Sequence, residues 1–458
     1  MGGEVPPMQH TAQLDLVVHW DGDGDSANPL NWSSLTKGLN LSLISAMSFI
    51  TPLASSMFAP SIEQVMKDFG TTTQFFATFS VSIYLIGYFF GPLLFAPLSE
   101  TYGRLIVYHI TNILYVVFTV ACAVAPSLDS LIGFRFLAGS AGSACLVLGA
   151  GSVADMYPRE KRGSKMTAFV LGPMMGPVVG PIAGGFISQD LDWRWIFWSI
   201  SIAAGVVAVA CLVCLRESYA PVILQKRALK SGAYASTQRH IANGPKPGED
   251  LLNALLYMAI IYGYLYLLFT TITQVYENVY GFSTGLAGLS YLGLGVGMVL
   301  GLAVFGSTSD KRLKKKKEKE GQVEPEFHLQ ALIPAALCIP VGLFWYGWSA
   351  EKKIHWIMPI LGTTWVGFAM TGVFFAIQMY LIDCYPLYVA SVTASNTVVR
   401  SLVGAFLPLA GRPLYDRLGL AWGNAVLAFI ALAMVPLPFI FLKYGAWLRT
   451  HPRFQVKL

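Results

Sequence analysis

The stretch GPMMGPVVGPIAGG, residues 172–185, decides the fold class of this chain. Its glycines and prolines recur every four positions, at Gly172-Pro173, Gly176-Pro177, Gly180-Pro181 and Gly184-Gly185. The apolar run 166–187 around it can cross a bilayer, which takes about 20 residues. Each proline frees the carbonyl four residues earlier, which a membrane helix tolerates where neighbouring helices supply new partners. The spacing predicts a transmembrane helix whose glycine face packs closely on another helix, and it leaves open whether this helix also bends during function.

The composition indicates a membrane protein. Of the 458 residues, 55% are hydrophobic and 12% are charged, whereas soluble proteins carry about 25% charged residues. Residues 1–36 are polar and acidic and lack the apolar core of a signal peptide, so we expect the first span to act as the targeting signal. Cys211 and Cys214 have a CxxC spacing, but they lie in an apolar run without a second pair, so we predict buried thiols and no metal site.

Twelve apolar runs predict an all-α membrane protein with twelve transmembrane helices in two six-helix repeats. The first six runs are residues 39–59, 75–98, 106–125, 131–154, 166–187 and 195–215. The second six are residues 251–275, 285–306, 329–348, 356–382, 389–409 and 422–442. The predicted division is a cytosolic tail (1–38), a six-helix bundle (39–215), a cytosolic loop (216–250), a second six-helix bundle (251–442) and a cytosolic tail (443–458).

The basic residues set the predicted orientation. With a cytosolic N-terminus, most of the 31 Lys and Arg residues fall in cytosolic segments, as the positive-inside rule requires. Both termini are then cytosolic. We interpret the four lysines at 314–317 as a topology signal and a contact for lipid headgroups, and we expect no nucleic-acid partner.

Two basic residues, Arg135 and Arg400, fall inside predicted spans. A charge at membrane depth costs about 2.5–3.5 kcal/mol on insertion scales, so such a residue usually faces a cavity or a partner. A structural contact between helices would explain each arginine, and so would a role in transport.

Several other function classes lack their motifs in this sequence. It contains no GxxxxGK[ST] phosphate loop and no HExxH metal motif, and its extramembrane segments are too short for a catalytic domain. We therefore predict no enzymatic activity, no cofactor and no metal.

Four further motifs occur in a characteristic order: GPLLFAPLSETYGRL (91–105), RFLAGSAGSA (135–144), ADMYPREKRG (154–163) and LRESYAPVIL (215–224). Together with the Gly-Pro series they make the chain resemble the major facilitator superfamily, and more narrowly the twelve-span drug:proton antiporters of fungi. The resemblance covers residues 31–454. The chain departs from similar proteins at residues 244–248 (GPKPG), which replace a basic, partly apolar segment before the seventh span.

The resemblance implies a gating latch on the cytosolic side. Glu100, Gly103 and Arg104 match the family's turn between the second and third spans, and Asp310 matches its repeat in the second half. Leu105 stands where a second basic residue is usual, so we expect a weaker latch.

The resemblance also implies proton antiport, because residues 172–185 match the motif that marks antiporters. Arg135 matches an arginine implicated in proton coupling, and we expect it to act on a nearby carboxylate. Asp155, Asp383 and Arg400 are the further candidates for proton coupling.

In this fold the first, fourth, seventh and tenth spans would line a central cavity. We expect its substrate-contacting residues to be Ser48, Thr51, Tyr262, Tyr266, Gln274, Phe368, Gln378, Tyr380 and Asn396. An apolar, aromatic pocket with few polar groups suits amphipathic organic molecules.

Together these features predict a monomeric secondary transporter that exports small amphipathic compounds in exchange for protons. Its partners would be the small-molecule substrate, protons and the lipid bilayer of the plasma membrane or the vacuole. Two alternatives stay open. One is uptake or facilitated diffusion of a nutrient or an organic cation such as a polyamine, and the other is a non-transporting sensor of the same fold.

Overall fold

The computed structural model describes residues 20–22, 24–71, 73–230, 249–320, 325–384 and 389–450, and these contain helices and turns but no strand. The first half comprises η1 (Pro29–Asn31), α1 (Ser34–Met57), η2 (Ala59–Ser61), α2 (Ile62–Asp68), α3 (Gln74–Tyr102), α4 (Arg104–Ala123), α5 (Leu128–Met156), α6 (Arg159–Asp190), α7 (Arg194–Cys214) and α8 (Ala220–Lys230). The second comprises α9 (Glu249–Tyr280), α10 (Thr284–Leu289), α11 (Leu292–Glu320), η3 (Pro325–Ala331), α12 (Leu332–Glu351), α13 (Ile357–Cys384), α14 (Val389–Met434) and α15 (Pro436–Thr450).

The expected spans are present in these residues. Eleven segments are long and apolar enough to cross a membrane, and the last of them, Ser391–Lys443, contains two expected spans. The two are joined because α14 continues across Gly419, whose φ of 75° is not helical. Glu351 caps the helix after this kink, since its Oε2 accepts hydrogen bonds from the amides of Leu420 (2.8 Å) and Ala421 (3.4 Å). The GPKPG segment before α9 lies outside the described residues.

The eighth span differs most from its expected bounds of 285–306. The helix is interrupted between α10 and α11, and α11 then continues to Glu320. Residues 311–320 are mostly Lys and Glu, which are strong helix formers. The basic segment therefore prolongs the span as a helix.

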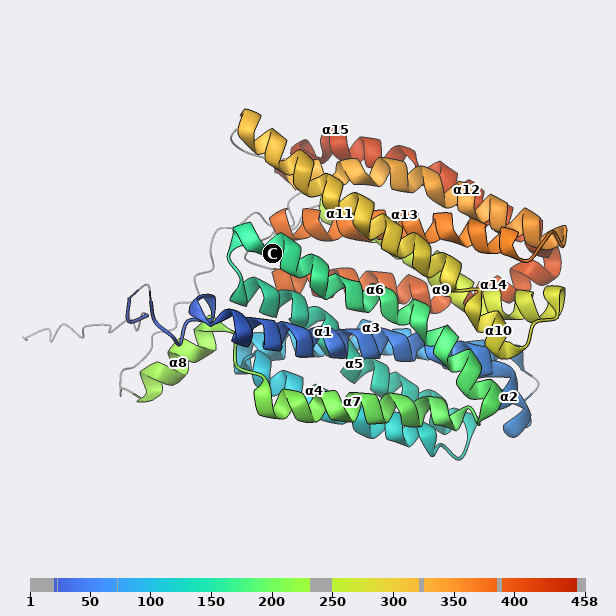
Figure 1. Cartoon of the computed structure of the whole chain (residues 1–458), viewed down its shortest axis with the longest axis horizontal. Coiled ribbons are helices and arrows are strands. Elements are labelled where there is room, and N and C mark those ends of the chain that lie inside the picture. The colour runs from blue at the N-terminus through green and yellow to red at the C-terminus, as the bar shows by residue number, and fades with distance from the viewer. Residues whose placement is uncertain are drawn as a thin grey trace, which may run out of the picture.

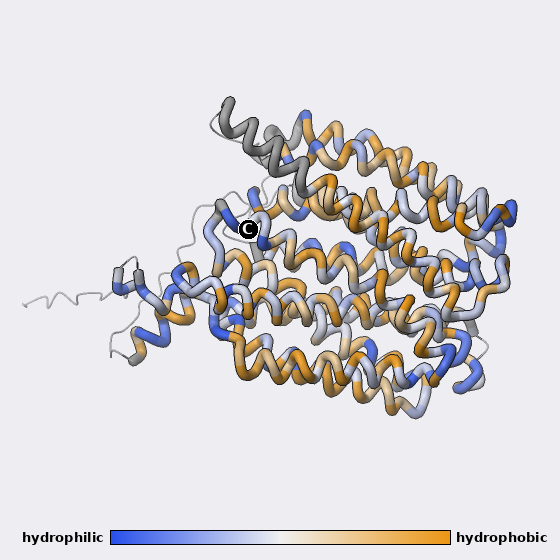
Figure 2. The backbone as a smooth tube through the Cα atoms, in the orientation of Figure 1, coloured by the Kyte–Doolittle hydropathy of each residue, from blue (hydrophilic) through white to orange (hydrophobic). Residues whose placement is uncertain are grey.

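The helices lie side by side along one direction, with α8 at one end and α2 and α10 at the other (Figure 1). We call these the α8 end and the α10 end. Hydrophobic residues follow the length of the bundle, while hydrophilic residues gather at both ends (Figure 2). Large apolar side chains face outward between the ends, Val213 being 78% exposed and Val206 67%. Such a surface requires a bilayer, and the protein is a multi-pass membrane protein.

An ion pair fastens the N-terminal segment to α8. Asp25 Oδ2 lies 2.7 Å from Arg227 Nη1. The hydrogen bond from Arg227, followed by those from the amides of Ala27 and Asp21, lowers the pKa of Asp25 to about 2. The carboxylate therefore stays charged at physiological pH, and the contact persists there.

Candidate functional site

The glycines of α6 pack against the backbone of α1. A Cβ placed on Gly172, Gly176, Gly180 or Gly184 would meet, in the same order, carbonyl oxygens of α1 that are also four residues apart: Ser45, Phe49, Leu53 and Met57. At Gly176 this Cβ would lie 2.6 Å from Phe49 O and 2.8 Å from Leu53 N, so only glycine fits. The predicted close packing is confirmed, and its partner is α1. The last glycine of the motif, Gly185, faces α10 instead, where a Cβ would lie 2.8 Å from Thr284 O.

The prolines of α6 make different contacts from its glycines. Pro181 leaves the carbonyl of Pro177 without its helical partner, and Ser56 Oγ of α1 donates to that carbonyl at 3.1 Å. Pro173 and Pro177 line a pocket in the centre of the protein. One helix therefore presents glycines to α1 and prolines to the pocket.

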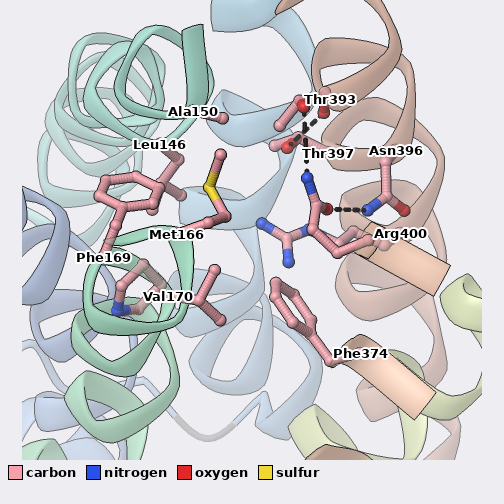
Figure 3. Close-up of a pocket in the computed structure, with 12 residues that line it drawn as sticks. Leu146, Ala150, Met166, Phe169, Val170, Phe374, Thr393, Asn396, Thr397 and Arg400 are labelled. Atoms are coloured by element: carbon pink, nitrogen blue, oxygen red, sulfur yellow. Dashed lines mark hydrogen bonds between the residues drawn. The ribbon is translucent and has the colours of Figure 1, made fainter. Parts of the chain in front are cut away.

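Two adjoining pockets lie between the halves of the chain. They share Leu146 of α5, Pro173 of α6, Phe374 of α13 and Arg400 of α14. Apolar side chains of α5 and α6 form one side of the first pocket, and polar side chains of α14 form the other (Figure 3). In this conformation each pocket has room for only about one or two water molecules. A larger molecule therefore does not fit in either pocket in this conformation.

Helices α13 and α14 supply the polar side of the pocket. Asn396 Nδ2 donates to Gln378 Oε1, and Gln378 Nε2 donates to Thr393 Oγ1, both at 3.3 Å (Figure 3). Asn396 Oδ1 is buried and has no hydrogen-bond partner among the described residues. The chain of amides therefore leaves one acceptor unused.

Arg400 enters the pocket from α14. Its guanidinium carbon lies 4.8 Å from the ring centre of Tyr262 and 5.4 Å from that of Phe374. The residue is 5% exposed, and its Nε is buried without a partner in the described part of the chain. Two aromatic faces thus hold the cation in place by cation–π attraction.

Arg135 of α5 is enclosed by aromatic rings. Its guanidinium carbon lies 4.7 Å from the ring centre of Phe58 and 5.3 Å from that of Tyr84. Its Nη2 donates to the carbonyl of Ser55 at 3.3 Å. Within the described part of the chain no carboxylate pairs with it, so the expected carboxylate neighbour is absent in this conformation. Aromatic faces and one carbonyl replace it.

The expected latch residue Arg104 lies in a cluster at the α8 end. Its Nε lies 3.4 Å from Asp155 Oδ2, and its Nη1 donates to Ser99 Oγ at 2.8 Å. Its guanidinium carbon lies 4.9 Å from the ring centre of Tyr219. Asp155, expected as a proton-coupling residue, is therefore part of the latch cluster and lies outside the pocket linings.

Glu217 completes this cluster and was not among the residues predicted from the sequence. Its two carboxylate oxygens accept hydrogen bonds from the amides of Arg104 (3.1 Å) and Leu105 (3.0 Å), which satisfies the free amides at the start of α4. Gly103 has a φ of 98° and a Cβ there would collide with this carboxylate. The available signal was the acid in the LRESYAPVIL motif after the sixth span.

The other expected charged residues lie apart from the pocket. Glu100 Oε1 accepts a hydrogen bond from Ser391 Oγ of α14 at 3.3 Å, which joins the two halves at the α8 end. Asp383 pairs with His328 Nε2 at 3.0 Å. Asp310 lies on α11, and its side chain is outside the described part of the chain.

The halves also touch at the α10 end. The amide of Gly285 donates to Gln189 Oε1 at 2.9 Å, and a Cβ on Gly288 would lie 2.9 Å from Pro181 O. These contacts join the two halves at the α10 end.

Of the expected cavity residues, Tyr262, Gln378 and Asn396 line the two pockets. The other six do not line either of these two pockets in this conformation. Four are buried between helices, namely Ser48, Thr51, Tyr266 and Tyr380. Gln274 is half-buried on α9. Phe368 lines a separate cavity beside α11 and η3.

Comparison with known proteins decides the family. A model described as Major Facilitator Superfamily matches residues 44–408. The chain belongs to the Major Facilitator Superfamily. The MFS-type transporter penM of Penicillium rubens is 49% identical over 96% of this chain and 91% of that protein. The MFS transporter cpaT of Aspergillus oryzae is 47% identical over 100% of this chain and 96% of that protein. The efflux pump radE of Floropilus chiversii is 41% identical over 96% of this chain and 86% of that protein.

Solved structures agree with this major facilitator fold. The xylose transporter XylE from E. coli, in a partially occluded inward open conformation, gives a TM-score of 0.67 at 16% identity, covering 90% of this chain and 98% of that one. The relatives are transporters, and this member of the superfamily is a transporter and not an enzyme. Its described residues contain no cluster of three potential metal ligands.

Proposed function

We propose that this protein exports small amphipathic organic compounds by proton antiport. The carrying observation is the pair of pockets between the halves, which combines apolar walls from α5 and α6 with a few polar groups from α13 and α14. Such a pocket suits molecules that are mostly apolar but carry one polar end.

Two observations support export over uptake. One relative is named an efflux pump, and residues 172–185 carry the glycine-proline series of antiporters. A polyamine substrate is disfavoured, because no Asp or Glu is among the residues lining the two pockets and a cation would meet Arg400.

The transport cycle we propose is alternating access between two bundles, residues 39–215 and 251–442. The α8 end is cytosolic in this proposal, with both termini there, and the working unit is a monomer in the plasma membrane. The bond between Glu100 and Ser391 would break when the cytosolic side opens, and the bond between Gln189 and Gly285 would break when the outer side opens. The three prolines soften α6, which takes part in the outer contact.

Asp155 is the acid whose position best suits a proton carrier. It is the ion-pair partner of Arg104, so a proton on its carboxylate would remove that pair and weaken the latch. Asp383 is bound to His328 and lies apart from both pockets. Each proton that enters gains about 2.3 kcal/mol per 100 mV of membrane potential, which can drive export.

Inverted plasma-membrane vesicles from yeast that expresses the chain would test this function. With an acid interior, a panel of amphipathic dyes should include some that accumulate, with release of protons from the vesicle. An uncoupler should abolish accumulation. Dye flux that ignores the uncoupler and the pH gradient would contradict antiport, and no flux of any dye would contradict export.

A further inference from the structure

Arg400 is a buried cation without an anion. It is 5% exposed, its Nε has no partner, and no hydrogen bond or ion pair to it occurs among the described residues. Its contacts are the faces of Tyr262 and Phe374. Buried charges in membrane proteins ordinarily pair with an acid or line a cavity, and Arg400 lines both central pockets.

Among the described residues, no acid pairs with Arg400. No Asp or Glu lines either pocket. Asp155 pairs with Arg104, and Asp383 pairs with His328. Arg135, another buried arginine, also lies against aromatic faces and has no acid partner among the described residues. The two central arginines therefore carry positive charge that no acid among the described residues compensates.

We propose that the substrate is an amphipathic organic anion whose acidic group binds Arg400. The proposal rests on the export function above and names its substrate class. The acidic group would be a carboxylate or another delocalised oxyanion, because the planar guanidinium matches two oxygens at once. The apolar body would lie against Leu146, Met166 and Phe169 across the pocket.

Two features prepare the site for such a molecule. The rings of Tyr262 and Phe374 fix the guanidinium before the anion arrives, which reduces the ordering cost of binding. Asn396 lines the same pocket, and its Oδ1 is buried without a partner among the described residues, so we expect it to accept a hydrogen bond from a hydroxyl or amide on the substrate. An inside-negative membrane potential also drives an anion outward, so this charge favours export.

Binding of two dyes that share one ring frame tests the charge preference. Fluorescein is an anion at pH 7.4 and rhodamine 123 is a cation, and both report binding by fluorescence anisotropy to the full-length protein in lipid nanodiscs. We expect tighter binding of fluorescein. Arg400→Gln should weaken fluorescein binding about ten- to hundredfold. The matched control is Arg417→Gln, which removes an exposed arginine from the same helix and should change binding less than about twofold.

Thermal stability without ligand separates a binding role from a structural one. Because the charge of Arg400 has no acid partner, Arg400→Met should leave the unfolding temperature unchanged or raise it, and fluorescein should stabilise only the wild type. A large loss of stability in Arg400→Met would overturn the proposal by making Arg400 structural. Tighter binding of rhodamine 123, or no binding of fluorescein, would overturn it too. The vesicle experiment tests the export function separately from this substrate class, because it counts the transport of dyes of either charge.

Discussion

Ser55 of α1 and Tyr266 of α9 share a hydrogen bond of 2.7 Å, which joins the two halves of the chain inside the protein. Ser55 Oγ also lies 2.6 Å from the carbonyl of Pro52 and donates to it, so Tyr266 is the donor in the shared bond. Tyr262 in turn donates to Tyr266 at 3.4 Å. A directed chain of hydroxyls therefore crosses from the second half to the first.

This chain of hydroxyls ends beside two of the buried arginines, Arg135 and Arg400. Arg400 stacks on the ring of Tyr262, and Arg135 donates to the carbonyl of Ser55. We predict that Tyr266→Phe and Ser55→Ala each destabilise this conformation and that the two changes are not additive. The coupling should be about 0.5–1.5 kcal/mol, the net value of one hydrogen bond, measured from the unfolding of single and double variants. Additive losses would mean that the bond contributes nothing.

The glycine face of α6 gives a sharper test of packing. Gly176→Leu should abolish dye transport while the protein still inserts in the membrane, because even a Cβ would collide with Phe49 O. Gly205→Leu on α7 is the matched control, since a Cβ there would meet no described atom within 4 Å apart from its own helix backbone, and it should transport normally. Transport by the Gly176 variant at the control rate would contradict close packing on α1.

Replacing two phenylalanines of α13 should have different effects on the KM for an exported dye. Phe374 lines both central pockets, so Phe374→Ala should raise the KM for an exported dye severalfold. Phe368 lines the separate cavity beside α11, so Phe368→Ala should leave KM unchanged. Initial rates in inverted vesicles measure both values, and equal effects would contradict the assignment of the central pocket.

The cap of α4 should contribute to stability. Glu217→Gln keeps the shape of the side chain but removes the charge that two amides of α4 contact. We expect a loss of about 1 kcal/mol and a lower unfolding temperature in nanodiscs. Glu63→Gln changes an exposed acid on α2 and serves as the control. If the two variants unfold at the same temperature, the charge of Glu217 does not stabilise the start of α4.

The sequence predicted helices and charged clusters better than the residues of the pocket. Hydropathy located the spans because each needs about 20 apolar residues, and the four-residue repeat of Gly172–Gly185 located a packing face. Glycine cannot indicate which helix it contacts, so the partner α1 emerged only from the structure. The same contact determines which side of α6 faces the pocket. For this reason Pro173 and Phe169 were not predicted as residues that line the pocket.

The aromatic environment of the arginines was also beyond the sequence. Phe58, Tyr84 and Tyr262 come from segments distant in the chain from the arginine that each contacts. A search along the sequence for acidic partners therefore could not identify them. Glu217 was missed for a related reason, since its partners are backbone amides more than a hundred positions earlier.

Access to the central pocket from each side of the membrane tests the central claim most directly. Thr397→Cys, in a variant with the six native cysteines replaced by serine, places one thiol in the pocket beside Arg400. A membrane-impermeant maleimide should label this thiol in right-side-out and in inverted vesicles, and fluorescein should protect it in both. Labelling from one side only, in the presence of a proton gradient, would contradict alternating access to this pocket.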